Sequence, residues 1–121
     1  MGETVAVTGA AGFIGRWVCA ELLARGHTVR GLDDLSAGAA ANVAAFDDDP
    51  AFSLTVGDVC DADAVGAVLD GATDRCIHLA ARIDVHESLS APTAHLQTNV
   101  LGTHTVLEAA RAHDEIGRAH V

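Results

Sequence analysis

Lysine and tyrosine are both absent from the 121-residue sequence, in which all seven basic residues are arginine. Any mechanism that needs a lysine amine or a tyrosine phenol is therefore excluded for this chain. The absence of lysine also rules out a P-loop, because that loop needs a lysine to reach the phosphates. Aromatic residues make up only 3% of the chain, whereas 50% of it is hydrophobic. This apolar content is sufficient for a packed core.

Cysteine is scarce, and its positions form no metal or disulfide pattern. The three cysteines are odd in number and unclustered: Cys19, Cys60 and Cys76. We expect reduced thiols in the core or on the surface. Four histidines recur every nine residues: His86, His95, His104 and His113. Nine residues turn a helix through about 900°, so neighbouring histidines would point to opposite faces. No metal site is expected.

No hydrophobic run approaches the ~20 residues needed to cross a bilayer. The first residues also lack the basic patch, apolar stretch and cleavage site of a signal peptide. A cytoplasmic protein is therefore predicted. The formal net charge is −10, and such a surface repels nucleic acids and anionic membranes. Neither is expected as a partner.

The apolar pattern predicts strands that alternate with helices. Strands are expected at 5–8, 28–32, 52–56 and 76–80, and helices at 14–25, 61–71 and 92–113, with a short helix around 42–46. Two apolar stripes mark the expected helix faces: Ile14, Val18 and Leu22 with Trp17, and Leu96, Val100, Thr103 and Leu107. This alternation predicts an α/β fold with a doubly wound, Rossmann-type parallel sheet. Only its N-terminal part is present, with about four strands in the order 3-2-1-4.

The segment from Thr8 to Gly15 reads TGAAGFIG and lies between the first strand and the first helix. Gly9 permits a tight turn off the strand, and Gly12 lets backbone N–H groups approach a pyrophosphate. Gly15 lets the helix pack close to the sheet. The phosphates would lie at the positive end of the helix dipole. This context predicts a dinucleotide-binding loop.

Asp33 ends the second strand at the distance expected for a ribose-binding acid. Its carboxylate can accept hydrogen bonds from both hydroxyls of an adenosine ribose, each worth roughly 1.5–3 kcal/mol. The same carboxylate would repel the 2′-phosphate of NADP. Arg30 is near in sequence but lies inside the strand. NAD is therefore favoured over NADP as the cofactor.

Five motifs in order resemble those of the extended short-chain dehydrogenases/reductases, in particular the NAD-dependent epimerase/dehydratase family that includes UDP-glucose 4-epimerase. Residues 8–15 resemble its TGxxGxxG fingerprint, and residues 31–38 its ribose-binding turn. Residues 57–61 and 78–81 resemble its third-strand and fourth-strand motifs. The pattern that follows is matched by Val85, Ser88, Pro92, Asn99, Val100, Gly102 and Thr103. The resemblance spans roughly residues 3–113.

The resemblance implies where the cofactor would bind. Asp58 and Val59 would hold the adenine ring, and Ala80 and Ala81 would line the path to the nicotinamide. The complete set of implied cofactor-binding residues is Gly9, Ala11, Gly12, Phe13, Ile14, Gly15, Asp33, Asp34, Asp58, Val59, Leu79, Ala80, Ala81 and Asn99. His78 is interpreted as a packed or capping residue, not a base.

The resemblance also implies a reaction whose catalytic residues this chain lacks. In the family, the nicotinamide takes a hydride from a sugar carbon while a tyrosine acts as base. A lysine four residues later lowers the pKa of that phenol from its usual value of about 10. No catalytic residue is assigned here, and the chain alone is expected to be inactive. A nucleotide-sugar substrate and a homodimer are implied for the full-length parent.

Residues 1–114 are expected to form a partial NAD-binding Rossmann domain. Residues 116–121, IGRAHV, can be encoded by ATC GGA AGA GCA CAC GTC, which resembles a widely used sequencing-library adapter. We therefore expect 115–121 to be an adapter-derived tail. A missing fifth strand would leave a sheet edge open to self-association. Two further functions stay open: a dinucleotide-binding module without chemistry, and an NADP-dependent extended reductase.

Overall fold

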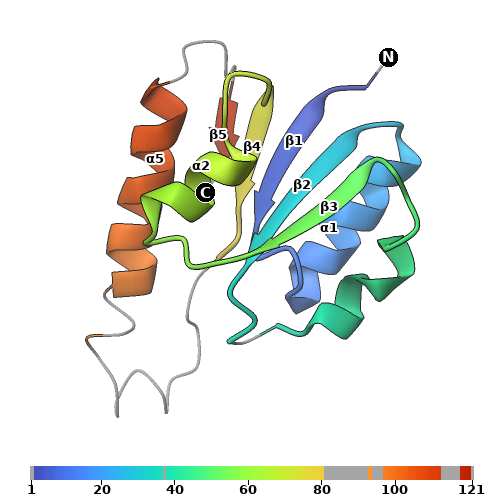
Figure 1. Cartoon of the computed structure of the whole chain (residues 1–121), viewed down its shortest axis with the longest axis horizontal. Coiled ribbons are helices and arrows are strands. Elements are labelled where there is room, and N and C mark those ends of the chain that lie inside the picture. The colour runs from blue at the N-terminus through green and yellow to red at the C-terminus, as the bar shows by residue number, and fades with distance from the viewer. Residues whose placement is uncertain (1, 37, 81–92, 94–96, 113–117, 121) are drawn as a thin grey trace.

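The computed structural model describes residues 2–36, 38–80, 93, 97–112 and 118–120. A parallel sheet lies between two layers of helices (Figure 1). Its strands are β1 (Thr4–Thr8), β2 (Thr28–Asp33), β3 (Phe52–Val56), β4 (Arg75–His78) and β5 (Arg118–His120). They lie in the order β3-β2-β1-β4-β5, and every neighbouring pair is parallel. The predicted doubly wound fold and the strand order 3-2-1-4 are confirmed.

The crossover segments cover opposite faces of this sheet. The helix α1 (Phe13–Ala24) and the 3-10 helix η1 (Ala40–Phe46) lie on one face. The helices α2 (Ala62–Val68) and α5 (Gly102–Ala112) lie on the other, and a π-helical turn, η2 (Gln97–Leu101), precedes α5 (Figure 1). In the described part of the chain, no helix is long and apolar enough to cross a membrane.

Alternate side chains of β1 enter two separate hydrophobic cores. Val5 and Val7 pack with Cys19 of α1 in one core, and Ala6 packs with Val106 of α5 in the other. This period of two follows from the pleat of a strand. β1 therefore packs against hydrophobic side chains on both faces of the sheet.

The boundaries of β4 and α2 differ from the sequence prediction. The strand β4 ends at His78, two residues before Ala80. The Leu79 N–H is shared between the carbonyl and the hydroxyl of Thr8, at 3.1 and 3.0 Å, and the Ala80 N–H donates to that hydroxyl at 3.2 Å instead of continuing the ladder. Asp61 caps α2 as expected, by accepting from the Asp63 N–H at 2.9 Å. The helix stops at Val68, before Gly71, since the Thr73 hydroxyl donates to the Val68 carbonyl at 2.9 Å.

The predicted buried face of α1 is partly wrong. Gly15 and Cys19 are the buried residues of this helix, whereas Ile14 and Trp17 are 63% and 60% exposed. Gly15 faces the glycine turn, where a Cβ would collide with the Gly9 carbonyl oxygen, and Cys19 packs in the core with Val5 and Val7 of β1. Gly26, with φ 86°, follows the helix as predicted.

The predicted face of α5 is also wrong in part. Val106 and Gly102 are buried, whereas Val100 and Leu107 are 54% and 46% exposed. The π-helical turn before α5 adds a residue to the repeat and rotates the following side chains relative to a continuous α-helix. Leu96, which the sequence predicts on the same face, lies outside the described residues, as does Pro92.

The strand β5 falls in the segment expected to be an adapter-derived tail. It pairs with β4 in parallel, with Arg118 beside Arg75 and Ala119 beside Cys76. The edge of β4 that was expected to be open is therefore paired. Backbone pairing of this kind depends little on side-chain identity, so it leaves the origin of residues 115–121 a prediction.

Candidate functional site

The carboxyl ends of β1 to β4 bring most of the candidate residues to one edge of the sheet. The four strands are parallel, and their arrowheads point to the same edge (Figure 1). The candidate residues described there follow β1 at 9–15, end and follow β2 at 33–34, and follow β3 at 58–59 and β4 at 79–80. The strand order reverses beside β1, which has β2 on one side and β4 on the other. In such folds, ligands bind at this switch point.

The glycine turn after β1 leaves no room for side chains at two of its positions. Gly9 has φ 71°, and a Cβ there would lie 2.9 Å from the Ala80 nitrogen. A Cβ on Gly15 would collide with the Gly9 carbonyl oxygen. Around Gly12, the Gly9 carbonyl oxygen at 3.3 Å is the neighbour that a Cβ would meet. The turn is thus tight at both ends and open in the middle, as a phosphate cradle requires.

Asp33 joins this glycine turn to the end of β2. One carboxylate oxygen accepts the Ala11 N–H at 2.9 Å, and the other accepts the Leu35 N–H at 2.8 Å. The residue is only 8% exposed. A carboxylate has about four acceptor positions, so each oxygen keeps one for a further donor. The side chain is therefore fixed and still able to accept two hydroxyl groups.

The carbonyl oxygen of Ala11, like its N–H, is hydrogen-bonded within the structure. It accepts the Asn42 side-chain amide at 2.7 Å and the Ala39 N–H at 3.2 Å. A Cβ on Gly38 would lie 2.5 Å from the same oxygen, so this position also requires glycine. The start of η1 and the segment before it are thereby attached to the glycine turn.

Asp34 differs from Asp33 in its role. It is exposed, and one of its oxygens accepts both the N–H and the hydroxyl of Ser36, at 2.9 and 2.7 Å. Between the two acids, Leu35 has φ 63°, a conformation that costs a non-glycine residue free energy. Asp34 therefore stabilises this tight turn, and Asp33 is the acid that faces the glycine turn.

The predicted adenine-binding residues after β3 separate into one exposed and one buried residue. Asp58 is exposed and accepts the Cys60 N–H at 2.8 Å. Val59 is only 4% exposed and packs in the core beside Gly102. Its side chain is thus committed to packing, which leaves its backbone as the group that can meet a base.

The end of β4 carries a hydrogen-bonded series that the sequence did not reveal. Thr8 and His78 are partners in the sheet register, and the Thr8 Oγ1 lies 2.6 Å from the His78 Nδ1. The other ring nitrogen lies 3.1 Å from the Thr103 Oγ1, and that hydroxyl donates to the Asn99 carbonyl at 2.8 Å. Burial lowers the pKa of His78 below its ordinary value of 6.5.

Asn99 is exposed in η2 and is linked to the edge of the sheet through this series. Ala81 lies outside the described residues, as do Val85, Ser88, His86 and His95. In the parts of the chain that are described, no group of histidine, cysteine or acidic residues could hold a metal ion.

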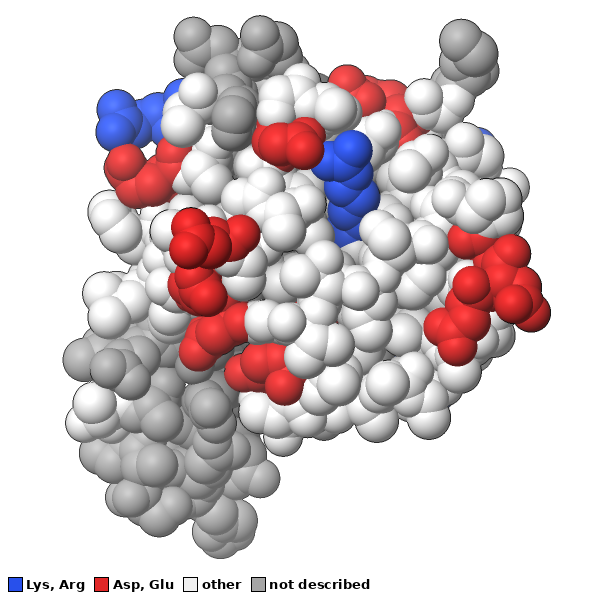
Figure 2. Space-filling view, in the orientation of Figure 1, with Lys and Arg blue, Asp and Glu red and all other residues white. Residues whose placement is uncertain are grey.

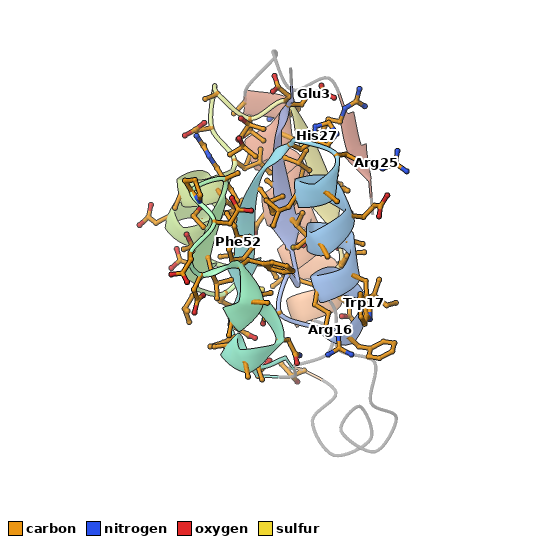
Figure 3. All side chains as sticks on the ribbon, turned by 90° about the vertical axis from the view of Figure 1, so that its right-hand side faces the viewer. Glu3, Arg16, Trp17, Arg25, His27 and Phe52 are labelled. Carbon is orange, nitrogen blue, oxygen red and sulfur yellow. The ribbon has the colours of Figure 1, made fainter. Side chains whose placement is uncertain are left out.

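The side chains in the first turn of α1 lie outside the glycine turn. Phe13 is 73% exposed, and the guanidinium carbon of Arg16 lies 5.2 Å from its ring centre and 5.0 Å from that of Trp17. Figure 3 shows Arg16 and Trp17 together at this end of the helix. Phe13 and Ile14 can therefore contribute their backbone N–H groups to a phosphate site, while their side chains point elsewhere.

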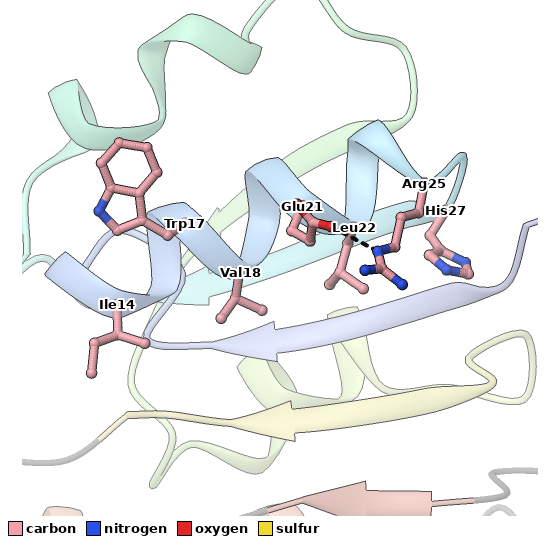
Figure 4. A pocket seen from close by; sticks show the side chains of 7 residues that line it. All are labelled: Ile14, Trp17, Val18, Glu21, Leu22, Arg25 and His27. Carbon is pink, nitrogen blue, oxygen red and sulfur yellow. Dashed lines mark hydrogen bonds and ion pairs between the residues drawn. The ribbon is translucent and has the colours of Figure 1, made fainter.

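An apolar groove runs along the same helix. Ile14, Val18 and Leu22 point from α1 toward the side on which β1 and β4 lie (Figure 4). Glu21 and Arg25 form an ion pair of 2.7 Å on its rim. The groove contains no fixed polar cluster like that around Asp33, so we do not assign the dinucleotide site to it. It is an uncovered part of the α1 surface.

The surface charge agrees with the excess of acidic residues in the sequence. Red carboxylates outnumber blue arginines on the face seen in Figure 2. The described arginines are largely used in ion pairs, such as Arg30 with Asp70 at 3.0 Å and Arg75 with Glu3 at 2.8 Å.

Thr8, Asn42 and His78 are the polar residues of the site that sequence reasoning did not assign to it. Thr8 directly precedes the first glycine, and His78 begins the fourth-strand motif. Both motifs were recognised, but the register that places these side chains opposite each other was not. Asn42 lies in a weakly patterned segment, and no signal in the sequence predicts its bond to Ala11.

Comparison with known proteins supplies a family. The model of a family described as GDP-mannose 4,6 dehydratase matches residues 6–120. A UDP-glucose 4-epimerase of Mycolicibacterium smegmatis is 44% identical over 105 residues, which are 87% of this chain and 34% of that protein. A dTDP-glucose 4,6-dehydratase of Streptomyces antibioticus is 42% identical over 115 residues, which cover 88% of this chain and 33% of that protein.

Solved structures agree with these matches. A double mutant of DesIV, a dTDP-glucose 4,6-dehydratase from Streptomyces venezuelae with NAD and DAU bound, superposes with a TM-score of 0.86 at 37% identity. The match covers 95% of this chain and 37% of that one. The chain thus spans about a third of the length of the relatives it matches.

Proposed function

The chain belongs to the family described as GDP-mannose 4,6 dehydratase, and from this membership we propose that it is the N-terminal, NAD-binding portion of a nucleotide-sugar epimerase or dehydratase. Its relatives of both kinds support this proposal. The NAD in the similar dehydratase structure supports the cofactor.

The observation that carries the proposal is the position of the Asp33 carboxylate. It accepts a backbone N–H from within the glycine turn, at Ala11, and keeps acceptor positions for two more donors. An adenosine ribose has two adjacent hydroxyls that can fill these positions. A 2′-phosphate at the same place would bring negative charge against a carboxylate, which disfavours NADP.

The residues of this edge fit a dinucleotide in other respects. A side chain at Gly9 would meet the Ala80 backbone, and one at Gly15 would collide with the Gly9 carbonyl oxygen, so the turn keeps this shape only with glycine at both positions. The N-terminal turn of α1 presents backbone N–H groups to the diphosphate, and we propose that Asp58 and the Val59 backbone meet the adenine. Leu79 and Ala80, at the end of β4, would line the nicotinamide half.

When bound, NAD would supply the hydride acceptor for oxidation of a sugar carbon. The residues of this chain would bind and orient it. The sequence has no tyrosine and no lysine, so the base and the cation that the family resemblance implies are not here. We expect the chain to bind NAD⁺ without converting a nucleotide sugar.

Titration calorimetry of the 121-residue chain with NAD⁺ and with NADP⁺ tests the cofactor. We expect NAD⁺ to bind more tightly by at least about tenfold, or about 1.4 kcal/mol. Equal or tighter binding of NADP⁺ would favour the extended reductase instead. If neither dinucleotide binds, the proposed function is wrong.

Sequencing of the source DNA across the codon for Asp114 tests the enzymatic part. A reading frame that continues into another strand and a Tyr-x-x-x-Lys motif supports the epimerase or dehydratase. A frame that continues without these two residues supports a binding module without chemistry. The nucleotide-sugar substrate and a homodimeric parent are part of the same proposal.

A further inference from the structure

Three side chains from three different elements meet at the end of β4. Thr8 belongs to β1, His78 to β4 and Thr103 to α5. Thr8 is fully buried and His78 is 5% exposed. The separations are 2.6 Å from the Thr8 Oγ1 to the His78 Nδ1, and 3.1 Å from the His78 Nε2 to the Thr103 Oγ1. The imidazole therefore bridges the central strand and the last helix.

The number of protons on each group determines the direction of these hydrogen bonds. A threonine hydroxyl has one proton and two lone pairs. The Thr8 hydroxyl already accepts the backbone N–H groups of Leu79 and Ala80, at 3.0 and 3.2 Å, and the Leu79 N–H is shared with the Thr8 carbonyl oxygen at 3.1 Å. Both lone pairs are thus used, and its proton is left for the His78 Nδ1. That nitrogen must be the unprotonated one.

The far side of the ring leads to the same assignment. The Thr103 hydroxyl donates its proton to the Asn99 carbonyl at 2.8 Å. It can therefore act only as an acceptor toward the His78 Nε2, which must carry the ring proton. The proton counts at Thr8 and at Thr103 are independent, and both assign the neutral Nε2–H tautomer to His78.

A charged imidazole does not fit this arrangement. A second ring proton, on Nδ1, would point at a hydroxyl oxygen whose lone pairs are occupied. The described part of β1 contributes no titratable side chain here. The titratable side chains described on β4 and α5 are those of Arg75, Cys76, His104, Glu108 and Arg111. Burial alone accounts for the lowered pKa of His78.

From this geometry we infer that His78 is a positioning residue of the dinucleotide site, held as the neutral Nε2–H tautomer. The inference rests on the proposed function. The ring accepts the Thr8 proton and so turns the hydroxyl lone pairs toward Leu79 and Ala80. These two backbone amides are then drawn against the glycine turn, where a Cβ on Gly9 would lie 2.9 Å from the Ala80 nitrogen. His78 thereby sets the spacing between the phosphate cradle and the nicotinamide half of the site.

The tautomer is tested by long-range ¹H–¹⁵N NMR of the histidine rings in the complete 121-residue chain. Thr103→Val identifies the His78 signals, because it removes the acceptor of the Nε2 proton and leaves the Thr8 bond in place. We expect the Nε2–H pattern for His78 and a titration midpoint below 6.5. The Nδ1–H pattern, or a midpoint at or above 6.5, would overturn the inference.

The positioning role is tested by NAD⁺ affinity at pH 7.5 in three variants. His78→Asn keeps an acceptor oxygen at about the place of Nδ1, whereas His78→Leu keeps no polar atom. We expect about tenfold weaker binding for His78→Leu, and binding within about threefold of the unaltered chain for His78→Asn. The control, His104→Gln, alters an exposed histidine on α5 and is expected to bind normally.

The outcomes separate this inference from the proposed function. Normal affinity in His78→Leu, or equal losses in the Leu and Asn variants, would overturn the positioning role alone. Absence of NAD⁺ binding by the unaltered chain would overturn the proposed function and the positioning role together. The NMR measurement decides the tautomer even if His78→Leu fails to fold, because it needs no substitution at His78.

Discussion

The carboxylate of Asp33 and the backbone N–H of Ala11 are joined by a 2.9 Å hydrogen bond across 22 residues of sequence. The acid that ends β2 is therefore part of the glycine turn that follows β1. A ligand that contacts one of them meets the other in a fixed position.

Asp33→Ala should weaken NAD⁺ binding by at least about 10-fold, since each of the two lost charge-assisted hydrogen bonds is worth roughly 1.5–3 kcal/mol. The preference for NAD⁺ over NADP⁺ should shrink, because the charge that repels the 2′-phosphate is removed. Titration calorimetry with both dinucleotides measures this. Asp48→Ala removes the same charge at an exposed position and should change neither affinity. An unchanged preference in Asp33→Ala would contradict the assignment.

Gly15→Ala should destabilise the fold by about 1–3 kcal/mol or more, because its Cβ collides with the Gly9 carbonyl oxygen. Urea denaturation followed by circular dichroism gives the free energy of unfolding. Gly66→Ala is the matched control, since a Cβ at Gly66 in α2 has no neighbour within 4 Å. That substitution should stabilise the fold by about 0.5–1 kcal/mol. Equal effects at the two glycines would show that the turn is looser than described.

The stabilisation that depends on His78 should increase with pH. Because burial lowers its folded-state pKa below 6.5, the unfolded state binds more protons near that pH. The stabilisation is fully present above 6.5 and is lost as the pH falls through the folded-state value. His78→Leu should therefore cost about 1–3 kcal/mol at pH 7.5 and less at pH 5.5. Denaturation of both proteins at the two pH values measures the difference. If His78→Leu loses more unfolding free energy at pH 5.5 than at pH 7.5, the prediction is wrong.

The three cysteines should differ widely in reactivity. Burial raises the pKa of the Cys19 and Cys76 thiols from 9.0 to about 12, so their thiolate fraction at pH 8 falls about a thousandfold. Cys60 is half-buried and should be alkylated first. Mass spectrometry of the native chain after timed iodoacetamide treatment follows each thiol, and urea should equalise them. Simultaneous native labelling of all three would contradict the burial.

Self-association should occur through the first turns of α1. Phe13, Ile14 and Trp17 are 73%, 63% and 60% exposed, and such clusters commonly mediate contacts. Trp17→Ser should weaken self-association by about tenfold, or about 1.4 kcal/mol, as measured by sedimentation velocity over a range of concentrations. Val56→Ser is the control, since Val56 is 62% exposed but lies on β3. Equal effects of the two variants would argue for a different surface.

The positions of the four main strands were predictable because each is a short apolar run bounded by turn residues, and their order because strands alternate with helices. The strand at 52–56 has the predicted bounds, and Asp61 is the predicted cap. Local patterns of this kind depend on neighbouring residues. Where a distant residue intervenes, prediction fails. After β4, the Ala80 N–H donates to the Thr8 hydroxyl, 72 residues away.

The buried helix faces were less predictable for a related reason. Periodicity indicates which residues share a face of a helix, but it does not reveal which face packs against the sheet. In α1 the close contact of Gly15 with the Gly9 carbonyl places Gly15 toward the sheet, and Ile14 is left exposed. The two acids were predictable from the sequence. Their distinct roles depend on hydrogen bonds that it does not show: Asp33 bonds to the glycine turn, and Asp34 to Ser36.

The central position of β1 has a consequence for synthesis of the protein. β1 is made before its two neighbours. It receives β2 soon afterwards, but its other edge receives β4, and Thr8 lies 70 residues before His78. At about 5–20 residues per second, a ribosome needs roughly 4–14 s to make that interval. For that time a nascent chain exposes an unpaired, valine-rich edge. This edge is where a chaperone or a neighbouring nascent chain would bind, before the site for the cofactor exists.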